Sequence, residues 1–131
     1  MKNAYLTFPY SHKSKLIRWY RWYQSARLSA RIMAKYPDMV VFSPVTHSHP
    51  VSLFLGNGLS HDFWLKQDFA YLDNWADIML IPTQIDATYK SKGILLEYRH
   101  FDGQVRPVWN DGDVRFDIRM DSFETNFKEE T

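Results

Sequence analysis

One short segment, residues 76–99, constrains the fold of this 131-residue chain more than any other part. The run Ala76-Asp77-Ile78-Met79-Leu80-Ile81 predicts a buried strand, and Ser91-Lys92-Gly93 begins a helix after a polar connection. A strand, a loop and then a helix is how α/β proteins build ligand sites at the carboxyl edge of a parallel sheet. The segment therefore predicts an α/β fold with a site close to the start of this helix.

The helix that begins near Gly93 carries a carboxylate on an apolar face. Ile94, Glu97, Tyr98 and Phe101 lie at i, i+3, i+4 and i+7, so they share one side of the helix. A charge in such a stripe is costly unless it has partners or a task. One turn earlier, Ser91 and the N–H groups that follow it lie at the helix N-terminus, where an anion such as phosphate is favoured.

The rest of the chain alternates between strand and helix patterns. Besides the segment above, strands are expected at residues 4–8, 39–42, 105–109 and, around Val114, Phe116 and Ile118, a possible fifth, and helices are expected at residues 12–35 and after Ser60. This order predicts one domain over residues 1–131, with a four- to five-stranded, mainly parallel sheet flanked by helices on both faces, as in flavodoxin-like and Rossmann-like folds. Pro107 suggests an edge position for its strand, and the polar tail from Asp121 is expected to fray.

The helix over residues 12–35 has one apolar face with arginines beside it. The apolar members are Leu16, Trp19, Tyr20, Tyr23, Ala26, Ala30 and Met33, and the arginines are Arg18, Arg21, Arg27 and Arg31. Spaced arginines on a helix are typical of a solvated surface. With a formal net charge of +1 for the whole chain, we expect no nucleic acid partner.

The helix after Ser60 contains a second embedded carboxylate. Its periodic positions i, i+4, i+7, i+8 and i+11 are Trp64, Asp68, Tyr71, Leu72 and Trp75. Two carboxylates in different surroundings can divide the nucleophile and acid roles that glycoside cleavage requires. Covalent catalysis by a carboxylate needs no metal, and we expect neither a metal nor another cofactor.

Composition excludes several kinds of site. The chain has no cysteine, so disulfides and thiolate metal sites are excluded. No apolar run approaches the length of a membrane span, and the N-terminus lacks a signal-peptide pattern. We therefore expect a cytoplasmic protein without a membrane partner.

Several of these residues together resemble the nucleoside 2-deoxyribosyltransferase superfamily. Tyr5-Leu6-Thr7-Phe8-Pro9 is similar to its Tyr-Leu-Ala-Gly-Pro opening, Asp68 to the aspartate before its third strand, and Ser91-Lys92-Gly93 with Glu97 to its Ser-x-Gly-x-x-x-Glu motif. Val41-Phe42-Ser43-Pro44 and His47-Ser48-His49-Pro50 resemble an uncharacterised, often phage-associated branch. The resemblance runs from Tyr5 to about Val108. Phe8 stands where the family has a glycine, which narrows the approach to a ligand, and Asp86 is displaced from the motif.

This resemblance implies cleavage of an N-glycosidic bond in a (deoxy)nucleoside 5′-monophosphate. By the same resemblance, Glu97 is the nucleophile, Asp68 assists departure of the base, and Tyr5 orients the glutamate. Ser91 would hold the phosphate. The remaining substrate-binding positions that it implies are Gly93, Phe8, Pro9, Ser43, His47 and His49. The partner would be a small nucleotide, and the protein a homo-oligomer, a dimer or tetramer.

The segment from Val45 to Gly58 is expected to be a long loop, and it keeps other functions open. Loops of this length in compact domains are usually functional. His47 and His49, with His61 and Asp62, could instead ligate zinc or iron in a metal-dependent phosphohydrolase. A third alternative is a nucleotide sensor on the same fold that has lost turnover.

Overall fold

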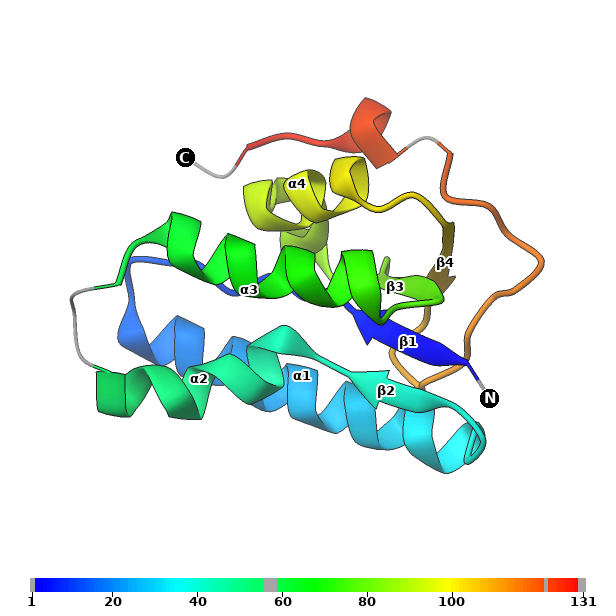
Figure 1. Ribbon diagram of the computed structural model, residues 1–131, viewed down its shortest axis with the longest axis horizontal. Coiled ribbons are helices and arrows are strands. Elements are labelled where there is room, and N and C mark those ends of the chain that lie inside the picture. The colour runs from blue at the N-terminus through cyan, green and yellow to red at the C-terminus, as the bar shows by residue number, and fades with distance from the viewer. Residues whose placement is uncertain (1, 56–58, 122, 130–131) are drawn as a thin grey trace.

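The computed structural model describes residues 2–55, 59–121 and 123–129. It confirms a single small α/β domain in which a four-stranded, all-parallel sheet is flanked by helices, as in flavodoxin-like folds (Figure 1). The strands are β1 (Asn3–Leu6), β2 (Val40–Phe42), β3 (Ile78–Pro82) and β4 (Gln104–Val108). The helices are α1 (Lys15–Lys35), α2 (Pro44–Leu55), α3 (His61–Asn74) and α4 (Lys92–His100), with 3-10 helices η1 (Asp86–Lys90) and η2 (Phe123–Asn126).

The sheet is covered on both faces because its strands are apolar on both sides. On β3, Ile78 and Leu80 pack with Leu28 and Ile32 of α1. The alternate residues of β3 belong to a second cluster, formed with α3, α4 and the tail, whose buried members are Tyr5, Leu72, Met79, Ile81, Ile94, Leu95 and Phe123. All five residues of β3 are buried, which is typical of a central parallel strand.

The strand order β2-β1-β3-β4 places a change of direction between β1 and β3. From β1 the chain passes to β2 on one side, and from β2 it returns to β3 on the other. Ligands of open α/β sheets bind at such a point, beyond the carboxyl ends of the strands. The edge position expected for the strand that contains Pro107 is confirmed, because β4 ends the sheet.

The expectation of a loop over Val45–Gly58 is wrong, because residues 44–55 form α2. The hydroxyl of Ser43 accepts a hydrogen bond from the backbone N–H of Thr46 at 3.3 Å, which caps the helix start. Pro50 inside the helix has no N–H for the carbonyl of Thr46. That carbonyl instead accepts a hydrogen bond from the indole Nε1 of Trp22 on α1, at 3.2 Å. Gly56 and Asn57 lie outside the described residues.

The possible fifth strand is also wrong. Val114 makes one isolated antiparallel bridge, to Val108. After it the backbone turns, since Phe116 N–H bonds the carbonyl of Val114 at 3.2 Å and Ile118 N–H bonds that of Arg115 at 3.2 Å. These local bonds use the groups that a strand ladder would need.

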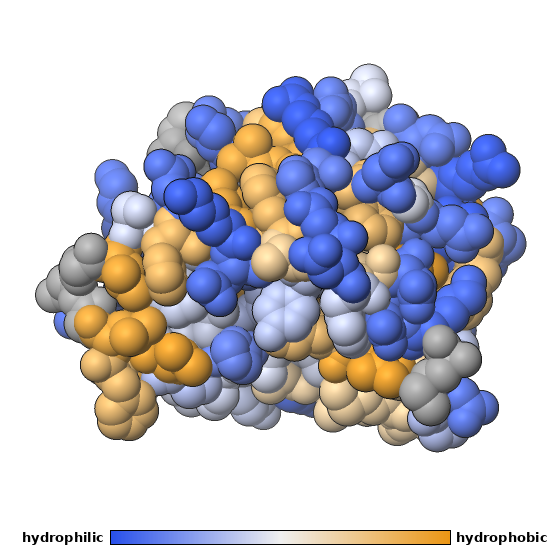
Figure 2. Space-filling model, viewed as in Figure 1, coloured by the Kyte–Doolittle hydropathy of each residue, from blue (hydrophilic) through white to orange (hydrophobic). Residues whose placement is uncertain are grey.

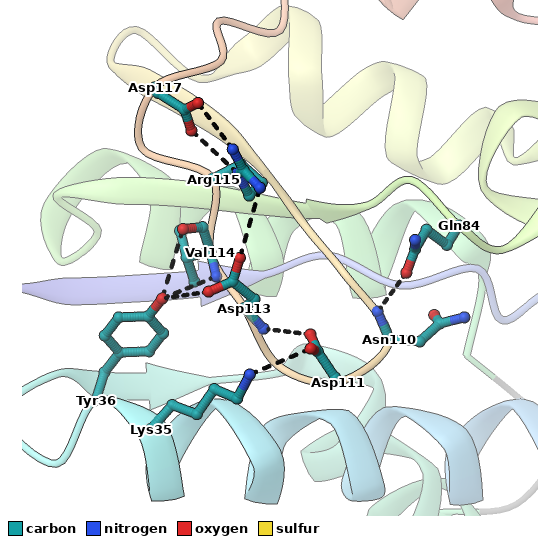
Figure 3. A network of polar contacts seen from close by, with 9 residues as sticks. All are labelled: Lys35, Tyr36, Gln84, Asn110, Asp111, Asp113, Val114, Arg115 and Asp117. Atoms are coloured by element: carbon teal, nitrogen blue, oxygen red, sulfur yellow. Dashed lines mark hydrogen bonds and ion pairs between the residues drawn. The ribbon is translucent and has the colours of Figure 1, made fainter.

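Polar contacts hold the preceding turn against α1 and its C-cap (Figure 3). Lys35 pairs with Asp111 at 3.3 Å, and the backbone N–H of Val114 donates to the Tyr36 hydroxyl at 3.0 Å. Gly112 has a φ of 92°, and a Cβ there would lie 2.7 Å from the backbone of Arg31. The turn thus needs glycine both for its backbone conformation and for its close approach to α1.

The described part of the tail packs instead of fraying. Phe123 is 1% exposed, and its ring stacks on Tyr89 at 5.3 Å between centroids. The backbone N–H of Lys128 donates to the carbonyl of Tyr89 at 2.8 Å. Met120, Phe123 and Phe127, spaced three and four residues apart, pack with the second hydrophobic cluster, although most other residues of the tail are polar.

The apolar face expected on α1 points to solvent. The face toward the sheet is made by Arg21, Ser25, Leu28, Ser29 and Ile32. The buried serines bond within the helix and to its neighbour: Ser29 donates to the carbonyl of Ser25 at 2.8 Å, and the hydroxyls of Ser25 and Thr46 lie 2.9 Å apart. No helix within the described ranges is long and apolar enough to cross a membrane.

Candidate active site

A cavity of about 170 Å³ lies beyond the carboxyl ends of β1 and β3. It is lined by Phe8, Tyr10, Ser11, Pro44, Val45, Ser48, His49, Ser52, His61, Trp64, Leu65, Asp68, Ser91, Gly93 and Glu97. Both carboxylates singled out from the sequence are on its wall. A second hollow of about 250 Å³ lies next to it and shares Ser11, His61, Ser91 and Gly93 as wall residues.

Glu97 is held by hydroxyl donors from β1 and the residue after it. Its carboxylate accepts a hydrogen bond from the Tyr5 hydroxyl at Oε2 and another from Thr7 Oγ1 at Oε1, the latter at 3.1 Å. Tyr5 and Thr7 are fully buried, and Glu97 is 5% exposed. Tyr5 and Thr7 occupy alternate positions, so they lie on the same side of the sheet, facing α4. The nucleophile expected from the sequence is therefore oriented before any ligand arrives.

Asp68 reaches the same cavity from α3. The helix follows Ser60, as expected from the sequence, and the Ser60 hydroxyl caps it by accepting a hydrogen bond from the N–H of Phe63 at 3.3 Å. Trp64, one turn before Asp68, lines the cavity beside it. Tyr71 turns away from the cavity and stacks on Phe42, with 4.0 Å between ring centroids.

The two carboxyl groups titrate as a pair well above their ordinary range. Burial raises the pKa of Asp68 to about 7. Burial, and then the nearby charge of Asp68, raises the pKa of Glu97 to about 8, against the lowering effect of the hydrogen bonds from Tyr5 and Thr7. Burial also raises the pKa of Tyr5, so its phenol remains a donor. Burial thus favours retention of a proton by this pair of carboxyls near neutral pH.

Ser91 has a structural task as well as a place on the cavity wall. Its hydroxyl oxygen accepts a hydrogen bond from the N–H of Ile94 at 3.2 Å, so Ser91 is the N-cap of α4. Its hydroxyl hydrogen remains able to donate to an anion. The second hollow adds positive charge beside it, from Lys90, Lys92 and Arg21, together with the carboxylate of Glu129. Gly93 leaves space, because a Cβ there would meet only the Ser91 hydroxyl at 3.7 Å.

One histidine of the His-x-His pair lines the cavity and the other does not. His49 Nδ1 lies 2.7 Å from the Tyr10 hydroxyl, and its ring stacks on Trp22 at 5.2 Å. Burial, and then the charge of Arg18, lowers the pKa of His49, so its ring is neutral at pH 7. His47 is exposed and packs against Phe42. This difference follows from α2: residues two apart on a helix point in different directions.

Among the sequence-predicted site residues, the fold gathers some and leaves others apart. The cavity wall includes six of them: Glu97, Asp68, Ser91, Gly93, Phe8 and His49. Tyr5 is not on the wall, but its hydroxyl donates a hydrogen bond to Glu97. Pro9, Ser43 and His47 are not on its wall. Ser43 instead caps α2.

Some wall residues were not assigned from the sequence. They are Tyr10, Ser11, Pro44, Val45, Ser48, Ser52, Trp64 and Leu65. His61 was named only as a possible metal ligand, and Thr7 is the missed partner of Glu97. The sequence does contain a signal for Thr7, because it lies two residues after Tyr5 within the strand predicted at residues 4–8, so both side chains are expected on one face. Ser48 and Ser52 have no such signal in the sequence, because they lie on one face only if residues 44–55 form a helix, in which residues four apart are neighbours.

The histidines do not form a metal centre. Within residues 2–55, 59–121 and 123–129, no three histidine, aspartate or glutamate side chains are gathered so that they could hold a metal ion. A wider hollow of about 500 Å³ lies between the end of α4 and β4. Its wall contains an ion pair between Arg99 and Glu124 at 2.9 Å. That hollow lacks a buried reactive group, whereas the cavity at the carboxyl ends of β1 and β3 has two.

Comparison with known proteins identifies a matching family model but no individual curated protein or solved structure. A family model described as "Domain of unknown function (DUF1937)" matches residues 2–111. No curated protein and no solved structure matches the chain. The matched range contains every residue of the carboxylate pair and its hydroxyl donors.

Proposed function

We propose that this chain, which belongs to the family described as "Domain of unknown function (DUF1937)", cleaves the N-glycosidic bond of a deoxynucleoside 5′-monophosphate through a covalent bond to Glu97. The observation that carries the proposal is the Glu97 carboxylate, buried, held by the hydroxyls of Tyr5 and Thr7, and facing a cavity that also contains Asp68. The resemblance of the sequence to nucleoside 2-deoxyribosyltransferases points to the same chemistry.

The first step forms one bond and breaks one. A Glu97 carboxylate oxygen attacks the anomeric carbon of the sugar, and the bond from that carbon to the base nitrogen breaks with its electron pair going to the nitrogen. Asp68 donates its proton to the departing base, which makes the base a better leaving group. In the second step Asp68, now ionised, removes a proton from water or a second base. That nucleophile attacks the same carbon and releases Glu97.

The proton must lie on Asp68 when Glu97 attacks. In the free protein burial raises the pKa of both carboxyls, so either one can hold the proton. Two features favour an ionised Glu97, with the proton on Asp68, when substrate binds. The hydroxyls of Tyr5 and Thr7 stabilise the ionised form of Glu97, and positive charge developing on the sugar attracts the same carboxylate.

A phosphate group on the substrate fits the second hollow. Ser91, with Lys90 and Lys92, borders that hollow, and the N-terminus of α4 adds its favourable field. The sugar would then lie between Ser91 and the carboxylate pair, with its base toward Trp64 and His49. The 170 Å³ cavity alone is small for a nucleotide, so the proposal needs the neighbouring hollow of about 250 Å³ to hold the phosphate.

The decisive experiment measures base release from a panel of deoxynucleoside monophosphates, with and without a chelator. Chromatography follows the free base, and intact-protein mass spectrometry follows a sugar phosphate bound to the protein. Wild type is expected to release base in both conditions. Glu97→Gln should show neither product nor adduct, while the matched exposed control Glu124→Gln keeps full activity. Binding without base release by wild type would instead support a nucleotide sensor, and phosphate release that the chelator stops would support a phosphohydrolase.

A further inference from the structure

From residue 48 onward, helix α2 turns polar side chains toward the cavity and apolar side chains to the surface. Ser48, His49 and Ser52 are on the cavity wall. Leu53 is 70% exposed and Phe54 91%, and apolar side chains gather on the surface where this helix ends (Figure 2). A helix that packs only for stability buries its apolar side. The polar side of α2 thus has a task in the cavity, and the chemistry proposed above does not use it.

The imidazole of His49 is fixed before any ligand arrives, and one of its nitrogens stays free. Its ring stacks on Trp22, with 5.2 Å between centroids, and the Trp22 indole is itself held by the carbonyl of Thr46 at 3.2 Å. Nδ1 lies 2.7 Å from the Tyr10 hydroxyl. Within the described residues Nε2 has no partner, and no buried side-chain nitrogen or oxygen there lacks one. Nε2 is therefore accessible, and the open space that His49 borders is the cavity.

The neighbours of His49 decide which of its two nitrogens carries the proton. Burial, and then the charge of Arg18, lowers the pKa of His49, so the neutral ring holds one proton, on Nδ1 or on Nε2. Burial raises the pKa of Tyr10, against the lowering effects of Ser52 and Arg18 beside its oxygen, so this phenol keeps its hydrogen. The guanidinium of Arg18 only donates, and a cation attracts the lone pairs of the Tyr10 oxygen and repels its hydrogen. The phenolic hydrogen therefore points to Nδ1, and the imidazole proton lies on Nε2.

We infer that the cavity selects a base with an oxo group, and not an amino group, on the edge that faces away from the sugar. This selection rests on the proposed function, because the carboxylate pair sets where the glycosidic bond lies and so directs that edge toward His49. An Nε2–H group donates and cannot accept, so it fits O4 of uracil or thymine and O6 of hypoxanthine or guanine. The amino group of cytosine or adenine would leave two donors facing each other. Tyr10 and Arg18 act through His49, as positioning residues.

The first test needs neither a nucleotide nor activity. Two-bond proton–nitrogen NMR spectra of protein labelled with ¹⁵N at histidine show which ring nitrogen carries the proton, and the spectrum of His49→Gln identifies the signals of His49. The proton is expected on Nε2 at pH 7. Tyr10→Phe should give a mixture of both tautomers, whereas the control Tyr20→Phe, which removes the same hydroxyl from an exposed position on α1, should change nothing. A proton on Nδ1 in wild type would overturn the inference.

The second test measures binding, so that it does not depend on turnover. Glu97→Gln, which should hold nucleotides without cleaving them, is titrated calorimetrically with 5′-monophosphates in matched pairs, deoxyuridine against deoxycytidine and deoxyinosine against deoxyadenosine. The oxo member of each pair should bind roughly tenfold more tightly or better, because a donor facing a donor is left unsatisfied. Adding Tyr10→Phe should reduce this preference to about twofold, mainly by improving the binding of the amino member, since the imidazole can then adopt either tautomer. Adding Tyr20→Phe should leave the preference unchanged.

The outcomes separate this selection from the proposed function. Equal binding of the two members of a pair, or tighter binding of the amino member, would overturn the selection even if wild type releases base. An oxo preference in a protein that releases no base would keep the selection and refute the glycosidase. Binding of none of the four nucleotides would overturn both. A preference that Tyr10→Phe leaves unchanged would show that the tautomer of His49 does not set it, and would overturn the inference as well.

Discussion

Glu97→Gln should change how the stability of the protein depends on pH, apart from its effect on activity. In the folded protein the pKa of Glu97 is raised from 4.5 to about 8, first by burial. Between these two values the folded state keeps a proton that the unfolded state has released. Stability therefore falls as pH rises through this window. Asp68, raised from 3.8 to about 7, contributes in the same direction.

The size of the effect follows from the same values. A difference of about 3.5 pH units corresponds to about 5 kcal/mol at about 1.36 kcal/mol each, as an upper bound. Relaxation around the charge reduces it, so we expect wild type to lose roughly 2 to 4 kcal/mol relative to Glu97→Gln between pH 5 and pH 8. The amide keeps the shape of the side chain, and any change in its bonds to Tyr5 and Thr7 is independent of pH.

Urea unfolding at pH 5, 6, 7 and 8 measures this difference. Glu124→Gln is the matched control, because its pKa is lowered by Arg99 and the carboxylate is exposed. The difference between the control and wild type should be flat over this range. If the stability curves of wild type and Glu97→Gln run parallel from pH 5 to pH 8, then Glu97 is not a buried acid of raised pKa.

Three further predictions concern the site and the fold. Ser91→Ala should raise KM for a 5′-monophosphate by roughly 10- to 150-fold more than for the nucleoside, as loss of a hydrogen bond to a charged group worth roughly 1.5–3 kcal/mol implies; equal effects on both substrates would exclude a phosphate contact. The dependence of kcat/KM on pH should be bell-shaped, falling at low pH when both carboxyls are protonated and at high pH when both are ionised, and Asp68→Asn should remove the alkaline limb; an unchanged limb would give the acid role to another group. Gly112→Ala should destabilise the protein by roughly 2 kcal/mol or more in thermal unfolding, because this position has a φ of 92° and an added Cβ would clash with the backbone of Arg31. Gly93→Ala is the control and should not destabilise the protein, because a Cβ there has space. Equal melting temperatures for the two variants would contradict this account.

The sequence by itself determined the features that depend on neighbouring residues along the chain. The apolar run at residues 76–81 predicted the buried strand β3, and the helix starts after Ser60 and near Ser91 were also predicted, because these signals lie within a few neighbouring residues. Glu97 and Asp68 stood out because a carboxylate on an apolar helix face conflicts with burial unless something compensates it. That conflict is visible without coordinates.

The tertiary structure decided what depends on contacts between distant segments. Pro50 predicts against a helix, because the carbonyl of Thr46 loses its helical hydrogen-bond donor. In α2 this carbonyl accepts a hydrogen bond from the indole of Trp22, 24 residues before Thr46 in the chain. Thr7 became a partner of Glu97 only when β1 and α4, 90 residues apart, met. Periodicity likewise placed an apolar face on α1 but could not say which side the sheet would cover. The face of α1 that packs on the sheet contains Leu28 and Ile32 together with the hydrogen-bonded Ser25 and Ser29. A periodicity analysis counts these serines as polar, so it does not identify this face as buried, and the aromatic face of the helix is left exposed.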